Sequence, residues 1–249
     1  MIELSHLTKK FGDLVAVSDL TLQVERGQFF AVLGPNAAGK TTLLRVLAGL
    51  LKPTSGAARV AGFDIQADPL EARRRMAYVP DFPFLYEKLT PWEFFRFTGQ
   101  IFQMSAGRLE EAARELIPRF NLDEFARKSI DGLSHGTRQR VAIVASLLHD
   151  PEVIIIDEPM VGLDPQHARV VKDVLKERTR RGCTVLLSTH QLSVAEEMAD
   201  RVGILHQGRL VAVGALGELR RQGSAGANGT LEQIFLNLTS GQTVPQQQS

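Results

Sequence analysis

Apolar and polar residues alternate along much of the first part of the chain, with the period of two that is typical of β-strands. This pattern predicts strands over residues 2–11, 17–25 and 28–34, and a shorter strand over 57–62. GKTTLLRVLAGL (39–50) has instead the spacing of an amphipathic helix, and it begins directly at a glycine-rich loop. We therefore expect an antiparallel β layer followed by a strand–loop–helix unit.

The pattern is mostly helical between two further predicted strands, AYVP (77–80) and PEVIIID (151–157). The second of these is a continuous apolar run, which is expected of a strand buried on both faces of a parallel sheet. Helices are predicted over 69–76, 91–102, 106–120 and 135–150. The α/β core should therefore carry a mostly helical insertion over about 82–150.

Helix and strand patterns alternate again in the last part of the chain. A helix over about 165–181, a strand over 183–188 and a helix over 192–200 precede a predicted hairpin over 201–214. The final residues are polar, and we expect them to be disordered. The order of elements predicts one α/β domain over 1–239, with a mostly parallel core sheet, and a polar tail over 240–249.

Composition narrows the class of protein. The 249 residues are 44% hydrophobic and 23% charged, with a net charge of +1, so no bulk field attracts nucleic acid or anionic lipid. The single cysteine, Cys183, excludes an internal disulfide. Apolar runs such as VAIVASLL (141–148) are too short to span a bilayer, and no segment resembles a signal peptide. We expect a cytosolic protein without a nucleic-acid partner, whose role at a membrane would need another subunit.

GPNAAGKT (34–41) matches the phosphate-binding pattern G-x-x-x-x-G-K-[ST] in the required place, after a strand and before a helix. Backbone N–H groups of such a loop surround phosphates. Lys40 would place its charge on the β- and γ-phosphates, the Thr41 hydroxyl can bind Mg²⁺, and Thr42 can reach an α-phosphate oxygen. The alternative is a chance glycine-rich turn. The predicted loop residues are Gly34, Pro35, Asn36, Ala37, Ala38 and Gly39.

VIIIDEP (153–159) supplies the acidic half of the predicted site. Asp157 comes at the C-terminal end of a buried strand, where ligands sit in open α/β sheets, and it would hold Mg²⁺ through a water. Glu158 follows and can orient or deprotonate the attacking water. The alternative is that Asp-Glu-Pro forms only a turn. The sequence thus predicts ATP and Mg²⁺ as cofactors.

With these motifs the chain resembles the ATP-binding subunits of ABC transporters. LSHGTRQR (133–140) is similar to the signature sequence of that family, VGLDP (161–165) to the loop that communicates across its dimer, and LLSTH (186–190) to the segment with its switch histidine. The segments 78–90 and 231–239 resemble exporter-type ATPases encoded apart from their membrane subunits. The resemblance implies a P-loop ABC ATPase fold and ATP hydrolysis coupled to transport, with membrane-spanning subunits as partners. It also implies a cytoplasmic position, peripheral on the inner face of the cell membrane.

The same resemblance implies a head-to-tail dimer, either of two identical chains or with a related ATPase subunit. Each ATP would lie between the P-loop of one chain and the signature of the other, so that Ser134 and the Gly136 N–H contact the γ-phosphate. His190 would bind the γ-phosphate and position the water near Glu158, and Phe11 would stack on adenine. The alternatives are an ordinary helix cap for Ser134, a structural role for His190, and a core strand position for Phe11.

Four residues depart from the usual family pattern. Ala37 stands where the loop usually has glycine, and His135 and Thr137 replace the third and fifth residues of the signature. Asp81 takes the place of a glutamine that normally contacts Mg²⁺ and the water and senses the membrane subunit. These changes affect the expected rate and coupling, whereas the predicted catalytic residues are all present.

Aromatic residues gather in one short segment, which is either a groove for a helix of a membrane subunit or the core of the helical insertion. We expect Phe94, Phe97 and Phe102 inside and some of the residues before Trp92 exposed. The aromatic residues of the segment are Phe82, Phe84, Tyr86, Trp92, Phe94, Phe95, Phe97 and Phe102.

Two other functions stay open at this stage. One is a soluble ATP-dependent switch on the ribosome or DNA, although that class generally carries two cassettes, a long coiled-coil insertion or zinc ligands, and this sequence has none of them. The other is a nucleotide-binding subunit that hydrolyses ATP poorly and relies on a non-identical partner. The sequence does not specify the transported substrate.

Overall fold

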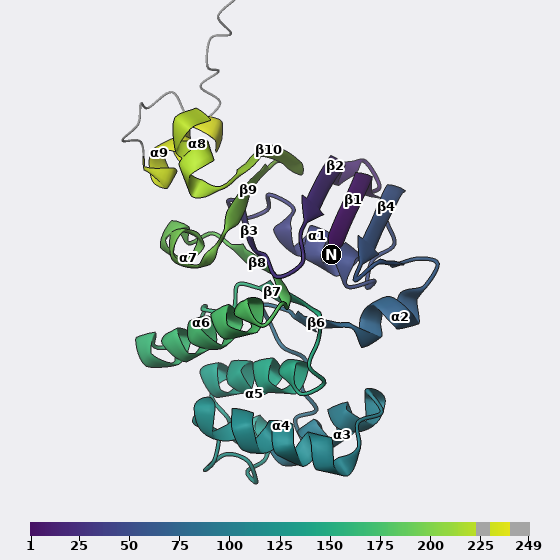
Figure 1. Ribbon diagram of the computed structural model, residues 1–249, viewed down its shortest axis with the longest axis vertical. Helices are drawn as coiled ribbons and strands as arrows, with labels where there is room; N and C mark the ends of the chain where they lie inside the picture. Colours follow the sequence, from purple (N-terminus) through teal and green to yellow (C-terminus); the bar gives the residue numbers. More distant parts are fainter. Residues whose placement is uncertain (223–229, 240–249) are drawn as a thin grey trace, which may run out of the picture.

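The computed structural model contains a larger β-sheet, which helices surround, and a smaller sheet at one side of the molecule (Figure 1). The structure describes residues 1–222 and 230–239, so the tail predicted over 240–249 lies outside the described residues. The expected α/β architecture is confirmed, with an antiparallel layer from the N-terminal part and a mostly parallel core sheet.

The smaller sheet has the strand order β2-β1-β4-β5, and its neighbouring strands are antiparallel. Side chains such as Ile2, Leu4 and Leu22 are buried because alternate residues of a strand face the same side. The pattern did not predict the two-residue strand β5, and it placed the start of β2 too late. The strands are β1 (Ile2–Phe11), β2 (Leu14–Val24), β4 (Ser55–Val60) and β5 (Phe63–Asp64).

The core sheet has the order β10-β9-β3-β8-β7-β6. Neighbours from β9 to β6 are parallel, and β10 pairs with β9 as the predicted antiparallel hairpin. Every residue of β3, β7 and β8 is buried, which explains the continuous apolar sequences of β3 and of β7 up to Asp157. The strands are β3 (Phe29–Leu33), β6 (Met76–Val79), β7 (Val153–Asp157), β8 (Thr184–Thr189), β9 (Arg201–His206) and β10 (Arg209–Gly214).

The helices of the predicted insertion lie together at one end of the molecule (Figure 1). Thr90 begins the first of them with a capping box, in which its side chain accepts from the Glu93 N–H and the Glu93 carboxylate accepts from the Thr90 N–H. These elements are α3 (Pro91–Ile101), α4 (Ala106–Arg119), the 3₁₀ helix η1 (Ile130–Gly132) and α5 (His135–Leu147).

The remaining helices follow the predicted order up to the hairpin, and two helices come after it that the sequence pattern did not predict. One of these, LGELRRQ, is short, and three of its seven residues are charged. The helices are α1 (Lys40–Leu47), α2 (Pro69–Arg74), α6 (Pro165–Arg180), α7 (Leu192–Met198), α8 (Leu216–Gln222) and α9 (Leu231–Thr239). None of the helices within 1–222 and 230–239 is long and apolar enough to cross a membrane.

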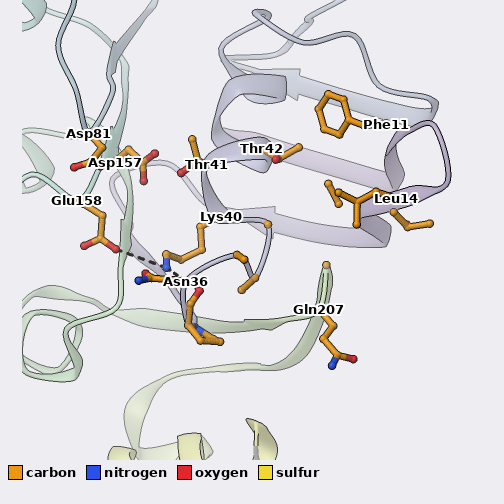
Figure 2. A pocket seen from close by; sticks show the side chains of 17 residues that line it. Phe11, Leu14, Asn36, Lys40, Thr41, Thr42, Asp81, Asp157, Glu158 and Gln207 are labelled. Atoms are coloured by element: carbon orange, nitrogen blue, oxygen red, sulfur yellow. Dashed lines mark hydrogen bonds and ion pairs between the residues drawn. The ribbon is translucent and has the colours of Figure 1, made fainter.

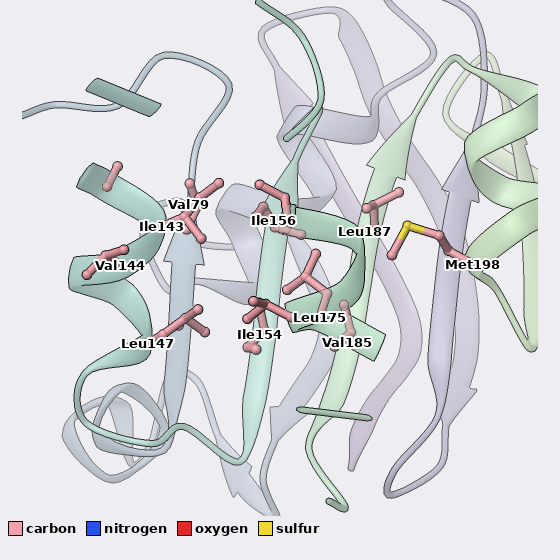
Figure 3. Close-up of a cluster of buried hydrophobic side chains, with 14 of the residues drawn as sticks. Val79, Ile143, Val144, Leu147, Ile154, Ile156, Leu175, Val185, Leu187 and Met198 are labelled. Atoms are coloured by element: carbon pink, nitrogen blue, oxygen red, sulfur yellow. The ribbon is translucent and has the colours of Figure 1, made fainter. Parts of the chain in front are cut away.

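The two faces of the core sheet enter different hydrophobic clusters. Ile154 and Ile156 of β7 pack in one cluster with α5 and α6 (Figure 3). Val153 and Ile155 point the other way, into a cluster with α1 and the smaller sheet. Because β7 is held on both sides, its C-terminal end has a fixed position, and that end carries Asp157 and Glu158.

The expectation for Phe97 was wrong. Its side chain is 36% exposed, whereas Phe95 is fully buried. Positions two residues apart on a helix point in nearly opposite directions, so burial of Phe95 turns Phe97 outward. Phe94 and Phe102 are half-buried. The expected exposure is confirmed at Phe82, Phe84 and Tyr86, which are 70%, 90% and 59% exposed.

Candidate functional site

A cleft of about 550 Å³ opens between the loop after β3, the end of β7 and the smaller sheet. It brings together most of the residues predicted for the nucleotide. In Figure 2, Lys40 points toward Glu158, and Thr41, Asp157 and Asp81 lie on the same side of the cleft. Phe11 and Leu14 lie toward the opposite side. The predicted residues that line the cleft are Phe11, residues 35–42, Asp81, Asp157 and Glu158.

The glycines at the two ends of the loop have no room for a side chain. A Cβ at Gly34 would lie 2.4 Å from the Leu205 carbonyl oxygen, and one at Gly39 would lie 2.3 Å from the Ala16 carbonyl oxygen. Gly39 also has φ +105, which L-residues rarely adopt. The loop is therefore packed tightly against β2 and β9.

Ala37 has φ 64, in the left-handed region. A residue with a Cβ there costs on the order of 1 kcal/mol relative to glycine. The loop keeps its shape at Ala37 because its ends are fixed elsewhere.

Lys40 is almost entirely buried, with 7% of its surface exposed. Its Nζ donates to the Gly34 and Pro35 carbonyl oxygens at 2.7 and 3.2 Å, and it lies 3.6 Å from Glu158 Oε1. Burial lowers the pKa of the Lys40 ammonium, while the Glu158 and Asp157 carboxylates oppose that shift. The ammonium is thus held inside the loop, with its charge facing the acidic side of the cleft.

Glu158 joins Lys40 to His190. Its Oε1 lies 2.9 Å from His190 Nδ1, and its side chain is 12% exposed while that of His190 is 48% exposed. The Glu158 N–H donates to the Ser188 carbonyl oxygen at 3.1 Å, which ties the turn after β7 to β8. His190 does not line the cleft, yet it contacts the residue that does. The carboxylate is therefore positioned from two sides, as a general base requires.

Asp157 is 1% exposed, and only one of its two carboxylate oxygens has a hydrogen-bond partner among the described residues. The Ser188 hydroxyl donates to its Oδ1, whereas Oδ2 is buried with no hydrogen-bond partner among the described residues. A buried carboxylate oxygen without a hydrogen-bond partner can bind a hydrated cation. Thr41 lies on the same side of the cleft as Asp157 (Figure 2). The sequence pattern missed Ser188, because its role depends on the register between β7 and β8.

The described part of the chain has no group of three or more His, Cys, Asp or Glu residues that could hold a metal by themselves. This agrees with the chemistry of Mg²⁺, which usually keeps several waters and takes one or two carboxylates together with substrate phosphates. The residues present therefore fit an Mg²⁺ ion that arrives with a nucleotide.

Asp81 lines the cleft close to two other carboxylates. Burial raises the pKa of the Asp81 carboxyl, the Asp157 and Glu158 charges raise it further, and His135 and His190 act in the opposite direction. The folded chain therefore holds the Asp81 proton more tightly than the unfolded chain does. Any stability from that proton is present below the unfolded pKa of about 3.9 and is lost as the pH rises above it.

Asp81→Asn should stabilise the chain without nucleotide at neutral pH, because it removes a charge that the neighbouring carboxylates disfavour. We expect a thermal midpoint at pH 7 that is higher by roughly 1–3 °C, and a difference that shrinks as the pH falls toward about 4. Circular dichroism melts across that range measure it, with Asp123→Asn, at an exposed aspartate, as control. A midpoint difference that does not change with pH would contradict the electrostatic explanation.

The far side of the cleft is apolar. Phe11 is 45% exposed, so it is not a core strand residue, and Lys9 Nζ lies 4.9 Å from the centre of its ring. Leu14 and Val15 extend this apolar wall. The turn between β9 and β10 adds Gly208, whose N–H donates to the Ala38 carbonyl oxygen at 2.9 Å. Sequence reasoning missed these last contacts, since no motif marks them.

Ser134 and Gly136 lie outside the cleft, at the exposed start of α5. Ser134 caps this helix, because its Oγ accepts from the Thr137 N–H at 3.2 Å. A Cβ at Gly136 would lie 2.9 Å from the Gly162 carbonyl oxygen, so the start of α5 packs closely on the loop 161–165. The predicted residues thus form two separate surfaces within one chain.

The chain is similar to known proteins over most of its length. Residues 17–161 match the family model described as ABC transporter. "Probable multidrug ABC transporter ATP-binding protein YbhF" of Escherichia coli (strain K12) is 35% identical over 240 residues, covering 96% of this chain and 41% of that protein. "Daunorubicin/doxorubicin resistance ATP-binding protein DrrA" of Streptomyces peucetius is 38% identical over 227 residues, covering 91% and 68%. The chain thus spans about two fifths of the length of the first relative.

Solved structures agree with the fold over nearly the whole chain. A protein described as "Structure of ATP binding subunit of ABC transporter" superposes with a TM-score of 0.91 at 34% identity, covering 96% of this chain and 99% of that one. The dimeric ATP-binding cassette MJ0796, in a post-hydrolysis state bound to ADP and Pi, gives a TM-score of 0.79 at 29% identity, covering 87% and 99%. The match to the family model, the identity to the curated relatives and the superposition together show that the chain belongs to the ABC transporter family, among the ATP-binding subunits.

Proposed function

We propose that this chain binds and hydrolyses Mg-ATP at the interface of two ABC cassettes and thereby powers a membrane-spanning exporter. The observation that carries this proposal is the contact set at one end of the cleft, where Glu158 lies between the Lys40 ammonium and His190. These contacts bring together a cation for the phosphates, Lys40, and a base for the water, Glu158. They also include His190, which orients the base.

In this proposal the loop 34–42 holds the phosphates and Phe11 stacks on the adenine ring. Thr41 and Asp157, with Asp81 beside them, hold Mg²⁺, which neutralises phosphate charge when bound. The unpartnered Oδ2 of buried Asp157 supports its assignment.

Glu158 acts on the attacking water. Its carboxylate takes a proton from that water while the water oxygen bonds to the γ-phosphorus, and the bond to the bridging oxygen of ADP breaks. His190 holds Glu158 through Nδ1 and is exposed enough to reach the γ-phosphate. Lys40 stabilises the charge that gathers on the phosphate oxygens.

The second surface serves a second chain. Ser134 and Gly136 of one chain complete the site on the other, and the exposed helix start fits that role because its N–H groups favour an anion. The dimeric state of the similar cassette MJ0796 supports the arrangement. The dimer forms between two copies of this chain or between this chain and a related ATPase subunit.

The membrane subunits bind at the aromatic segment after Asp81. Phe82, Phe84 and Tyr86 are exposed there, and a groove of about 200 Å³ runs beside them between Pro83, Phe94 and Phe102. The names of the similar proteins, which include multidrug and daunorubicin/doxorubicin resistance, support an exporter. Residues 1–239 act as one cassette with a helical insertion over 82–150, on the cytoplasmic, inner face of the cell membrane.

Replacing Ser134 with arginine tests the second surface. The bulky side chain at the exposed helix start should block the dimer while ATP affinity of the monomer stays within about twofold, because Ser134 lies outside the cleft. We expect the ATPase rate to fall at least about tenfold. Phosphate release measures the rate, and fluorescent-nucleotide binding measures the affinity.

A mixture of Ser134→Arg and Lys40→Ala chains sharpens this test. One composite site in the mixed dimer has both residues unchanged, so the mixture should turn over ATP faster than either variant alone. Monomer affinity that falls as much as turnover would contradict a role in the opposite site.

A further inference from the structure

Three polar side chains at the start of α5 are connected in a row. Arg140 Nη2 donates to Thr137 Oγ1 at 3.1 Å, and Thr137 Oγ1 lies 2.9 Å from Ser134 Oγ. The Thr137 N–H also donates to Ser134 Oγ at 3.2 Å. The row begins at a residue with 6% of its surface exposed, passes through one with 4% exposed, and ends at the exposed Ser134.

Arg140 is a buried positive charge with neutral partners. Its other donors reach the carbonyl oxygens of Phe120, Asn121 and Gly136 at 2.6, 3.1 and 3.4 Å. Within residues 1–222 and 230–239, no carboxylate oxygen lies within 4.0 Å of the Arg140 guanidinium, so Arg140 forms no ion pair there. Burial lowers the pKa of the guanidinium, but arginine stays charged in proteins. The Asp164 and Glu124 charges act on the guanidinium from farther away, whereas its hydrogen-bonding partners are neutral dipoles.

Hydrogen positions along the row follow from this charge. Arg140 can only donate, so Thr137 Oγ1 must accept from it. A hydroxyl whose oxygen accepts from a cation becomes a stronger donor, and Ser134 Oγ is the acceptor within its reach. Ser134 then accepts from Thr137 and keeps its own hydrogen for an acceptor outside the helix.

We propose that Thr137 is a positioning residue, which passes the field of the buried Arg140 charge to the Ser134 hydroxyl and aims that hydroxyl at the γ-phosphate of ATP in the opposite site. The proposal rests on the proposed function, in which Ser134 completes that site. It is particular to this chain, because the signature usually has glutamine where Thr137 stands, and glutamine has no hydroxyl to join the row.

Dimer formation with Mg-ATP tests the row in a Glu158→Gln background, where hydrolysis is slow. Thr137→Val removes the hydroxyl at nearly constant volume and should raise the dimer dissociation constant about tenfold, the size of one charge-assisted hydrogen bond. Thr137→Ser restores a hydroxyl and should stay within about twofold. ATP affinity of the monomer should not change in either variant. Analytical ultracentrifugation with Mg-ATP measures the dimer.

A double-mutant cycle separates positioning from packing. Ser134→Ala alone should also weaken the dimer, and Ser134→Ala with Thr137→Val should be no weaker than Ser134→Ala alone, because Thr137 acts through Ser134. Effects that add in the double variant would overturn the proposal. If Thr137→Val does not fold, Thr137→Ala enters the same cycle with the same expectation.

Thr179→Val is the matched control. Its hydroxyl donates to the Leu175 carbonyl oxygen at 2.9 Å within α6, so the variant loses a partly buried helix hydrogen bond away from the row and should leave the dimer unchanged. The outcomes distinguish the two proposals. If Ser134→Ala does not change the dimer dissociation constant, both the role of Ser134 in the opposite site and the role of the row are wrong. An effect of Ser134→Ala without one of Thr137→Val would overturn the row alone.

Discussion

Lys40→Ala should lower the rate of phosphate release from ATP by about a hundredfold or more, the loss typical for removing a group that stabilises transition-state charge. The reason is the fixed position of the ammonium. Its Nζ is held by two loop carbonyl oxygens, so its charge needs no rearrangement to meet the phosphates. No other lysine lines the cleft among the described residues, so nothing nearby can replace it.

The experiment compares Lys40→Ala with Lys88→Ala, because the Lys88 side chain is 90% exposed and far from the phosphate loop in sequence. The two variants have the same net charge, so a difference between their ATPase rates cannot come from net charge. ATPase rates are measured at several ATP concentrations, so that a loss of affinity and a loss of turnover are separated. Unchanged turnover in Lys40→Ala would remove the loop from the proposed chemistry.

Glu158→Gln should slow hydrolysis by about 10²–10⁴-fold, the usual contribution of a general base, while Mg-ATP still binds. Glutamine keeps the length of the side chain and its hydrogen bond to His190, but it cannot accept the proton of the water. Since the γ-phosphate then stays between the two surfaces, the dimer should persist. Size-exclusion chromatography with Mg-ATP should show a dimer, and the same chain with Mg-ADP should show a monomer.

Glu110→Gln, at an exposed position of α4, is the control for the loss of one negative charge. It should hydrolyse ATP at the rate of the unmodified chain. A Glu158→Gln chain that remains monomeric at high protein and Mg-ATP concentrations would argue against the two-chain site, even if its turnover is low.

The sequence predicts the phosphate loop and the acidic strand end well, because both depend on local rules. A glycine-rich loop between a strand and a helix and an apolar run that ends in Asp157 require only short-range patterns. The core sheet follows from the same apolar runs. The sequence also predicts the antiparallel layer, although its edge strand β5 is too short to leave a pattern.

Contacts between distant segments are harder to predict. The bond from Ser188 to Asp157 depends on the register of two strands that are 31 residues apart at this point. Arg140 of α5 reaches the Phe120 carbonyl oxygen at the end of α4, a contact between two helices that no motif marks. Phe97 was misplaced for a related reason. Periodicity gives the faces of a helix, but which face meets the core is decided by the helices that pack against it.

The tight packing of the loop ends has a consequence for how this sequence can change over generations. A Cβ at Gly34 would lie 2.4 Å from a backbone oxygen, and one at Gly39 would lie 2.3 Å from another. Any mutation that replaces either glycine should therefore damage the nucleotide site. Ala37 meets only a backbone preference and no such collision, which makes it a tolerable substitution. Substitutions in the middle of the loop should therefore be tolerated, whereas Gly34 and Gly39 should stay unchanged. Sequences that descend from this chain should vary in the middle of the loop and not at these two glycines.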